Sequence, residues 1–387
     1  MSITYKQDFE QYVGIKNAAG KSIFAKPQYP AKVQGVSDIL DQAEKEDVSM
    51  LRDFLLKDTR PLYVFGAGGS LSSATFAAKL ATEHGIVAQT MTPMMIMQLP
   101  AAIVSQCRFL AIGASGKSAD QIAALTYLLG INPEGVFALS LNGLDKYKRP
   151  TALTKLMEAN PKAKFLCTHW EMHGDGYVGT RNHVALLILV YRAFYPEVND
   201  LKEQLIHPEE TAFELTMPDG MGLKDIDTLH LLHAGMGEVA AIDLEGRCAE
   251  CGIVATMVTD VKNFTHGRHT FVHTHPQNGI VMLSGPKDKP FGDAVLSTFR
   301  KYDHVVTINI STKHEGALGA IELMIRTLYF ALDLSYAKRV DIKKPAGKPK
   351  FGAELWKLEP GQTAEYYETQ LKEIDKKMNS KADKEED

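Results

Sequence analysis

Residues Leu62–Ser70 read LYVFGAGGS, a short apolar run that leads into a glycine-rich turn, and a helical pattern follows over Ser72–His84. A glycine turn at the start of a helix directs several backbone N–H groups, and the positive end of the helix dipole, toward one point. This arrangement suits a phosphate dianion, to which a hydroxyl adds one more donor. The stretch therefore predicts a phosphate-binding loop at Gly68, Gly69 and Ser70.

A second loop of the same kind follows in this half of the chain. The apolar run Phe109–Ile112 predicts a buried strand, and Gly113–Ser118 after it reads GASGKS. Loops at the carboxyl ends of neighbouring parallel strands converge where such sheets bind ligands. The predicted phosphate ligands of this loop are Ser115, Gly116, Lys117 and Ser118.

The strand–turn–helix pattern then starts again. Leu229–His233 is apolar, Ala234–Glu238 is a glycine turn, and Val239–Cys251 is a helical run. The chain thus has the pattern of an internal duplication, in which short buried strands alternate with helices and favour parallel sheets covered on both faces. The other predicted strands are Val136–Leu141, Phe165–Cys167, Ile253–Val258, Ile280–Leu283 and Val305–Ile310, and Ala317–Leu332 is a further predicted helix.

The predicted fold is α/β, with two tandem domains that are each a parallel sheet flanked by helices, a flavodoxin-like three-layer sandwich. Residues 1–58 are interpreted as a helical extension, 59–200 as the first domain and 201–221 as a linker. The second domain is predicted over 222–370, and 371–387 is a charged tail that we expect to be a frayed helix or disordered.

Composition excludes several classes of protein. A net charge of −4 over 387 residues leaves no basic surplus for nucleic acid. The apolar run Val184–Tyr191 is too short to cross a membrane. Four cysteines in a chain of this length do not indicate a disulfide scaffold, which favours a reducing cytoplasm. The single C-x-x-C of Cys248 and Cys251 lies in a predicted helix without a second ligand pair, so we interpret it as structural.

Three other interpretations of the glycine loops compete with phosphate binding. Glycine turns occur at strand ends in any α/β sheet. A dinucleotide fingerprint would need a glycine near position 71, which is Leu71. A Walker loop would need a glycine five residues before Gly116, where the chain has Ala111. Both nucleotide interpretations are therefore disfavoured.

The two loops resemble the signature loops of sugar isomerase (SIS) domains, whose hydroxyls hold a sugar phosphate. Ser70, Ser115 and Ser118 match hydroxyl positions of that pattern. Gly113 replaces the first serine of the second loop, and Lys117 stands where many members have an acidic residue.

The resemblance extends over most of the chain, from about Arg60 to Leu355. Its duplicated arrangement is similar to the isomerase half of glucosamine-6-phosphate synthase and to related deaminases and deglycases. The stretch Gly176–Arg181 stands where the family places another loop near the ligand, which implies Thr180 as a substrate ligand.

Moving a sugar carbonyl between C1 and C2 needs a base that takes a carbon-bound proton and an acid that opens the ring. The resemblance implies Glu250 as the base and His266, sixteen residues later, as the ring-opening histidine. Glu245 matches a Leu-Glu-Gly element of the family in a different register, so both glutamates are candidates and Glu250 is preferred. The family also places a lysine near the C2 substituent, and the resemblance leaves Arg247 and Lys262 as the two candidates for that position. The turn at 235–238 is interpreted mainly as a scaffold for the helix that carries these residues.

In the family the histidine often comes from a neighbouring subunit, which implies a homodimer or higher homo-oligomer with a shared active site. Neither a metal nor another cofactor is predicted. His273 and His275 are expected on an extended strand near His269, but no carboxylate or cysteine completes a metal site nearby.

The resulting prediction is an enzyme that acts on a phosphorylated hexose or amino sugar through an enediol or enamine. Isomerisation, deamination and cleavage of a fructosamine phosphate are all compatible with the sequence. The alternative from another class is a non-catalytic sensor of sugar phosphates. Residues 1–58 have no basic recognition helix and are too few for a glutamine-hydrolysing domain.

Overall fold

The structure is a computed structural model. It describes residues 2–4, 29–144, 148–168, 170, 180–206, 211–275, 277–302, 304–342, 355 and 358. The predicted tail 371–387 lies outside the described residues. No helix among the described residues is long and apolar enough to span a membrane.

The first sheet is parallel and has the strand order β3-β2-β4-β5-β6. Its central strands β4 and β5 are buried along their whole length, as expected for a sheet covered by helices on both faces. The strands are β2 (Leu62–Phe65), β3 (Ala88–Met91), β4 (Arg108–Gly113), β5 (Val136–Ser140) and β6 (Lys164–Cys167).

The second sheet has the order β1-β7-β11-β10-β8-β9. Its β9, β8, β10 and β11 run parallel, whereas β7 pairs antiparallel with β11, and β1 pairs antiparallel with β7. The α/β architecture with helix-covered parallel sheets is confirmed, with two antiparallel strands added at one edge. The strands are β1 (Ser2–Thr4), β7 (Thr211–Thr216), β8 (Thr228–His233), β9 (Ala255–Asp260), β10 (Asn278–Ser284) and β11 (Val305–Ser311).

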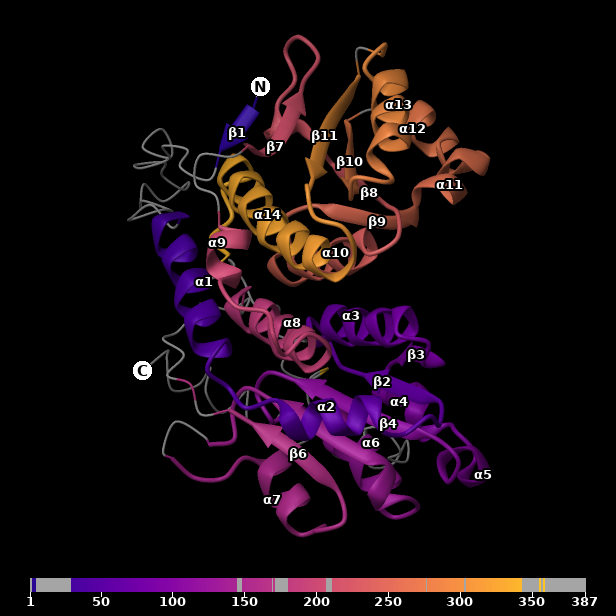
Figure 1. Ribbon diagram of the computed structural model, residues 1–387. Coiled ribbons are helices and arrows are strands. Elements are labelled where there is room, and N and C mark those ends of the chain that lie inside the picture. Colours follow the sequence, from indigo (N-terminus) through magenta and orange to yellow (C-terminus); the bar gives the residue numbers. More distant parts are fainter. Residues whose placement is uncertain are drawn as a thin grey trace, which may run out of the picture.

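Four helices form a layer between the two sheets, as Figure 1 shows. They are α3 (Ser70–Glu83), α8 (Thr180–Phe194), α10 (Gly237–Cys251) and α14 (Gly316–Ala337). The largest buried apolar cluster fills this layer and both facing sheet surfaces. Two smaller clusters fill the outer faces of the first and second sheets. The central layer therefore holds the two halves together.

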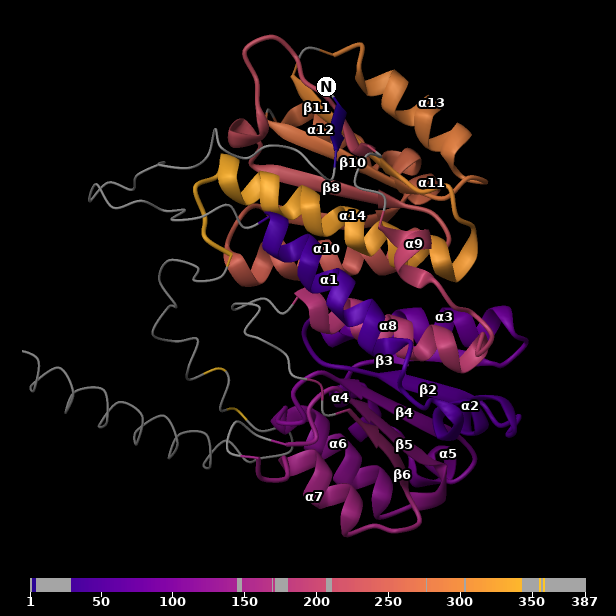
Figure 2. The same cartoon turned by 60° about the vertical axis from the view of Figure 1, so that its left-hand side comes forward.

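Of the remaining helices, α1, α2 and α9 add buried residues to the central cluster, and the others lie on the outer faces of the two sheets. In Figure 2, α1 lies across α8 and α14. The predicted N-terminal extension thus contains a strand of the second sheet and two helices, and the predicted linker contains α9 and β7. The α-helices besides the four of the central layer are α1 (Tyr29–Ala43), α2 (Ser49–Leu56), α4 (Pro93–Met97), α5 (Ala101–Val104), α6 (Ala119–Leu129), α7 (Ala152–Glu158), α9 (Leu201–Leu205), α11 (Val261–Asn263), α12 (Thr270–Thr274) and α13 (Lys289–Phe299).

Candidate functional site

The first predicted loop joins β2 to α3 in a shape that needs glycine. Gly68 has φ +54°, a conformation that other residues rarely adopt. A Cβ added to Gly66 would lie 3.1 Å from the carbonyl oxygen of Ile112, so this loop lies directly against the end of β4. Within the described residues, the N-cap of α3 is Gly69, which makes no side-chain cap hydrogen bond. The N–H groups of Ser70 and Leu71 in this first turn already donate to backbone carbonyls, so an anion here would rely on the positive end of the helix dipole and on nearby hydroxyls.

The second predicted loop lies beside the first because β2 and β4 are parallel neighbours. Gly116 has φ +63°, and a Cβ there would lie 2.7 Å from Thr151 Oγ1. The side chain of Asn142, just after β5, donates to the carbonyl of Ala114 at 2.9 Å. The loop after β5 thus fixes the shape of the second loop.

The predicted hydroxyls lie on these two loops. Ser70 is buried at the start of α3, and Ser115 accepts a hydrogen bond from the backbone N–H of Lys117 at 3.2 Å. Ser118 is the N-cap of α6 and accepts from the backbone N–H of Gln121 at 3.4 Å. A hydroxyl that accepts these bonds still has its own proton to donate. The side chain of Lys117 is exposed beside them.

Gln121 occupies the place of the serine that is missing at Gly113, and the sequence analysis did not identify it. A Cβ added to Gly113 would lie 2.3 Å from Gln121 Oε1. Gln121 is 3% exposed, and its Nε2 has no hydrogen-bond partner among the residues that the structure describes. A buried amide donor without a partner is costly, and a ligand oxygen would satisfy it. The signal in the sequence was the glycine that replaces the first serine.

A buried charged network links α8 to α10 behind the first loop. His183 Nδ1 lies 2.5 Å from Asp243 Oδ1, and Arg247 Nε donates to the other oxygen of Asp243. Burial alone would raise the pKa of Asp243, but the charges of Arg247 and His183 lower it to about 2. A Cβ added to Gly69 would lie 2.2 Å from His183 Cε1, so the imidazole packs directly on the loop. The sequence alone pointed to Asp243 only as one of three carboxylates on this helix, and gave no role to His183.

Glu250 reaches the same loop from the last turn of α10. Its Oε1 would lie 3.7 Å from a Cβ added to Gly68. Its side chain keeps exposed surface, yet the protein around the carboxylate removes water and raises its pKa. His183 and Arg247 oppose this rise, and Asp243 adds to it. A carboxylate from one half of the chain therefore faces the predicted phosphate loop of the other.

The other predicted residues have different surroundings. Glu245 is half-buried on α10, and its charge helps to raise the pKa of Glu250. Arg247 is 4% exposed and donates to Asp243, and its Nη2 has no hydrogen-bond partner in the described part of the chain. Thr180 begins α8, but its side chain lies outside the described positions.

His266 lies apart from this site within one chain. It is exposed on the kinked segment Phe264–Arg268 after β9. Within the described residues, no hydrogen bond or ion pair joins His266 to Glu250. The expectation of a histidine supplied by a neighbouring subunit stays a prediction.

The histidines near His266 do not lie on an extended strand, so that prediction is wrong. His273 is on the helix α12, which ends at Thr274, and His275 follows as its C-cap. Phe271 and His275, four residues apart, stack at 3.9 Å, which one turn of helix allows and an extended strand does not.

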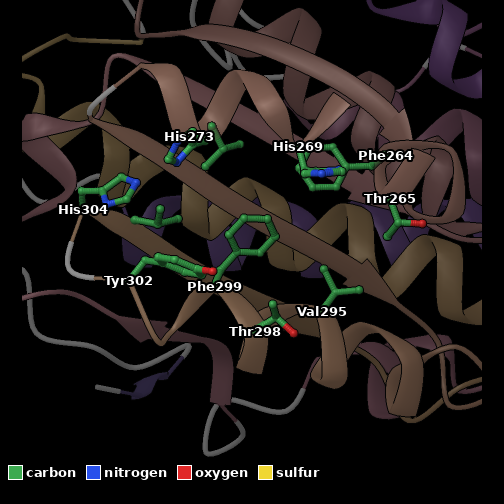
Figure 3. Close-up of a pocket in the computed structure, with 11 residues that line it drawn as sticks. Phe264, Thr265, His269, His273, Val295, Thr298, Phe299, Tyr302 and His304 are labelled. Atoms are coloured by element: carbon green, nitrogen blue, oxygen red, sulfur yellow. The ribbon is translucent and has the colours of Figure 1, made fainter. Parts of the chain in front are cut away.

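Figure 3 shows a pocket of about 450 Å³ that carries some of these histidines. Its walls are mainly aromatic and aliphatic. No group of three histidine, cysteine or acidic side chains among the described residues could hold a metal ion. The residues labelled in this pocket are Phe264, Thr265, His269, His273, Val295, Thr298, Phe299, Tyr302 and His304.

Burial also explains the C-x-x-C pair. Cys248 and Cys251 are both buried free thiols on α10. Burial raises the pKa of Cys248 to about 12, so this thiol is not a ready nucleophile.

No family model matches the sequence, and no curated protein matches it in a sequence search. Solved structures do match the fold. Glucosamine-6-phosphate deaminase from Thermotoga maritima is similar with a TM-score of 0.57 and 13% identity, over 81% of this chain and 97% of that one. The C-terminal domain of glucosamine-fructose-6-phosphate aminotransferase from Francisella tularensis gives 0.58 and 14%, over 82% and 96%.

Tagatose-6-phosphate ketose/aldose isomerase from Escherichia coli is also similar, with a TM-score of 0.57 and 15% identity, over 80% of this chain and 89% of that one. At these identities the likeness concerns the fold. The chain has the fold of phosphosugar isomerases and deaminases with SIS domains, as the two signature loops predict.

Proposed function

We propose that this protein is an enzyme that moves a proton between adjacent carbons of a phosphorylated hexose or amino sugar. One observation carries the proposal. The carboxylate of Glu250, whose pKa is raised by burial, faces the glycine loop at Gly68, which leads to the hydroxyl of Ser70. A phosphate held at one end of a sugar and a base near the other are the two requirements of this chemistry.

In this proposal the phosphate binds the N-terminus of α3 and the hydroxyls of the two loops. Ser70, Ser115 and Ser118 donate to its oxygens, and Lys117 adds a positive charge at the rim. The amide of Gln121 takes the place of the missing serine. The sugar then extends from the loop toward Glu250, which removes the proton at C1 or C2 and returns it to the neighbouring carbon.

Ring opening needs a group that moves a proton to the ring oxygen. Within one chain His183 is the candidate, because Asp243 holds its Nδ1 and its ring packs on Gly69. A carboxylate on one ring nitrogen fixes the tautomer and leaves the other nitrogen for proton transfer. His266 of a neighbouring subunit is the second candidate, and it requires a homo-oligomer with a shared site.

The decisive experiment measures solvent deuterium in a panel of hexose, hexosamine and fructosamine phosphates. We expect deuterium at C1 or C2 of at least one of them. Release of ammonia indicates deamination, and release of a larger amine indicates deglycation. Deuterium uptake without release of ammonia or amine indicates isomerisation. If no compound of the panel takes up deuterium, the enzyme proposal fails and a sugar-phosphate sensor becomes the better explanation.

The amide of Gln121 is expected to contribute to substrate binding. Gln121→Ala should raise KM for the sugar phosphate about tenfold and change kcat little, because one hydrogen bond to a charged group is lost. Steady-state kinetics on the substrate found by the panel will measure this. Gln106→Ala, which changes an exposed glutamine near the start of β4, is the matched control and should change neither constant. An unchanged KM in Gln121→Ala would remove Gln121 from the site.

Glu245→Gln separates the two candidate bases. Activity requires the deprotonated base, so we expect kcat/KM to rise with pH through a pKa above 4.5, the ordinary value for glutamate. Because the charge of Glu245 raises the pKa of Glu250, the variant should stay within about tenfold of the wild-type rate and shift this limb to lower pH. A pH–rate profile measures both effects. If Glu245→Gln instead abolishes turnover, Glu245 is the base.

A further inference from the structure

The pocket of Figure 3 lies on the outer face of the second sheet, whereas Glu250 lies on α10 in the central layer. One wall comes from the segment between β9 and β10, which carries α11 and α12, and the other comes from α13 and the start of β11. Its volume of about 450 Å³ is within the range of small-molecule sites. The proton transfer proposed above uses none of its lining residues.

Apolar side chains form the deep part of this pocket. Val272 and Val305 are each 2% exposed, and Val295 is 9% exposed. Phe264 is 1% exposed, and its ring centroid lies 5.9 Å from that of Phe299 on the opposite wall. This contact joins the two walls on one side, and all five side chains line the hollow beside it. The interior therefore favours an apolar group over a hydrated ion.

Rings make up much of the lining. Six of the eleven lining residues carry an aromatic or imidazole ring, and both walls contribute to them. On one wall Phe264 and His269 meet edge to face with centroids 6.4 Å apart, and on the other Tyr302 and His304 do so at 6.1 Å. An aromatic group between these walls finds ring faces and edges to pack against, which a saturated group of the same size uses less well. The lining therefore favours a planar ring.

The rim of the pocket carries polar groups. His269 and His273 are exposed, Tyr302 is 51% exposed and His304 is half-buried. In Figure 3 the imidazole nitrogens of His273 and His304 lie at the same end of the space between the walls. We expect the polar group of a ligand at that end, where it also reaches water.

The charge of that polar group follows from the side chains available to it. The imidazoles, the phenol and the two threonine hydroxyls of the lining can all donate a hydrogen bond. The part of the lining that the structure describes contains no carboxylate. An ammonium group would therefore have no opposite charge beside it, whereas a carboxylate would accept charge-assisted hydrogen bonds from the imidazoles.

We propose that this pocket is a binding site for a small aromatic acid. The ring lies between Val272 of one wall and Phe299 and Tyr302 of the other. The carboxylate accepts hydrogen bonds from His273 and His304. The proposal depends neither on the phosphate loops nor on Glu250 as a base, so it stands or fails separately from the proposed function.

The test compares three probes on the full chain by isothermal titration calorimetry. They are 2-naphthoate, its neutral analogue 2-naphthalenemethanol and its saturated analogue decahydro-2-naphthoate. We expect 2-naphthoate to bind as a single equivalent per chain, about tenfold more tightly than either analogue, because each analogue lacks one of the two recognised groups. Equal binding of the alcohol would overturn the acid, and equal binding of the saturated acid would overturn the ring.

Variants at the rim locate the bound probe, with each fold checked by circular dichroism. His273→Ala should weaken 2-naphthoate about tenfold through the lost hydrogen bond, and Tyr302→Ala about three- to tenfold through the lost ring contact. His275→Ala is the matched control, because His275 is exposed, stacks on Phe271 and lies outside the lining. Ser70→Ala separates this pocket from the phosphate loops. Both controls should leave the affinity for 2-naphthoate unchanged.

Amide hydrogen exchange gives an independent location. Bound 2-naphthoate should slow exchange within residues 264–273 and 295–302. The proposal is overturned if 2-naphthoate does not bind, or if both rim variants bind it as the wild type does. Sedimentation identifies the other occupant of such a face: a dimer that Tyr302→Ala weakens, in a chain that does not bind 2-naphthoate, would show that a second copy covers the pocket.

Discussion

Glu250→Gln is expected to reduce solvent deuterium uptake at C1 and C2 by roughly 10²–10⁴-fold, the usual contribution of a general base. The amide has the shape of the carboxylate but cannot accept the carbon-bound proton. Substrate binding should change little, because the phosphate loop at Gly68–Ser70 is untouched. Isotope exchange followed by NMR, together with calorimetric binding, will separate the two effects.

Glu245→Gln is the matched control on the same helix, five residues earlier. If both variants retain exchange, neither glutamate is the base and the proposed chemistry is wrong. If Glu250→Gln loses substrate binding as well as deuterium exchange, Glu250 contributes to binding the substrate before any proton moves. The base assignment then fails although the site stands.

Asp243→Ala should lower the free energy of unfolding by about 3–5 kcal/mol, the usual cost of breaking a buried ion pair. The variant leaves Arg247 buried beside His183 without its carboxylate. Urea denaturation at neutral pH, followed by circular dichroism, will measure the change.

A surface pair with the same spacing is the control. Asp53 and Lys57 form an i,i+4 ion pair at 2.7 Å, with the Asp53 side chain 46% exposed. Asp53→Ala should cost no more than about 0.5 kcal/mol, because solvent screens this pair. Equal losses of unfolding free energy in Asp243→Ala and Asp53→Ala would contradict the role assigned to the buried network.

The same network should also make the stability of the protein depend on pH. The folded pKa of Asp243, about 2, is below its ordinary value of 3.8. Its contribution to stability is therefore complete above about pH 4 and is lost as the pH falls toward 2. The Asp243→Ala variant should lack this part of the acid dependence.

Much of the fold follows from local pattern. Leu62–Phe65 is a strand with the predicted bounds, because a short uninterrupted apolar run directly before glycines is typical of a buried strand that ends in a turn. The strands β1, β3 and β7 were not predicted. Ala88–Met91 is half-exposed at the edge of the sheet, and β7 (Thr211–Thr216) mixes polar and apolar residues within a segment interpreted as a linker. Strands of this kind form because a neighbouring strand pairs with them, and that pairing leaves no local pattern in the sequence.

The candidate site was less accessible from sequence because its parts are far apart along the chain. The loops at Gly68 and Gly116 carry their own signal, since a positive φ selects glycine. His183 lies in the first turn of α8 and Asp243 sixty residues later on α10, so no local sequence pattern links them until the two helices pack together. The choice between Glu245 and Glu250 likewise depends on which face of α10 meets the first half.

The antiparallel pairing of α3 with α10 has a consequence for inheritance. Each helix starts at its own half's glycine loop and ends with a glutamate that faces the other half, Glu250 toward Gly68 and Glu83 toward Gly316 at the start of α14. A fragment with only one half would keep a glycine loop and lose the acid opposite it. Gene truncation, or exchange of one half between relatives, would therefore remove both of these contacts at once. The two halves must be kept as a pair, however similar their folds become.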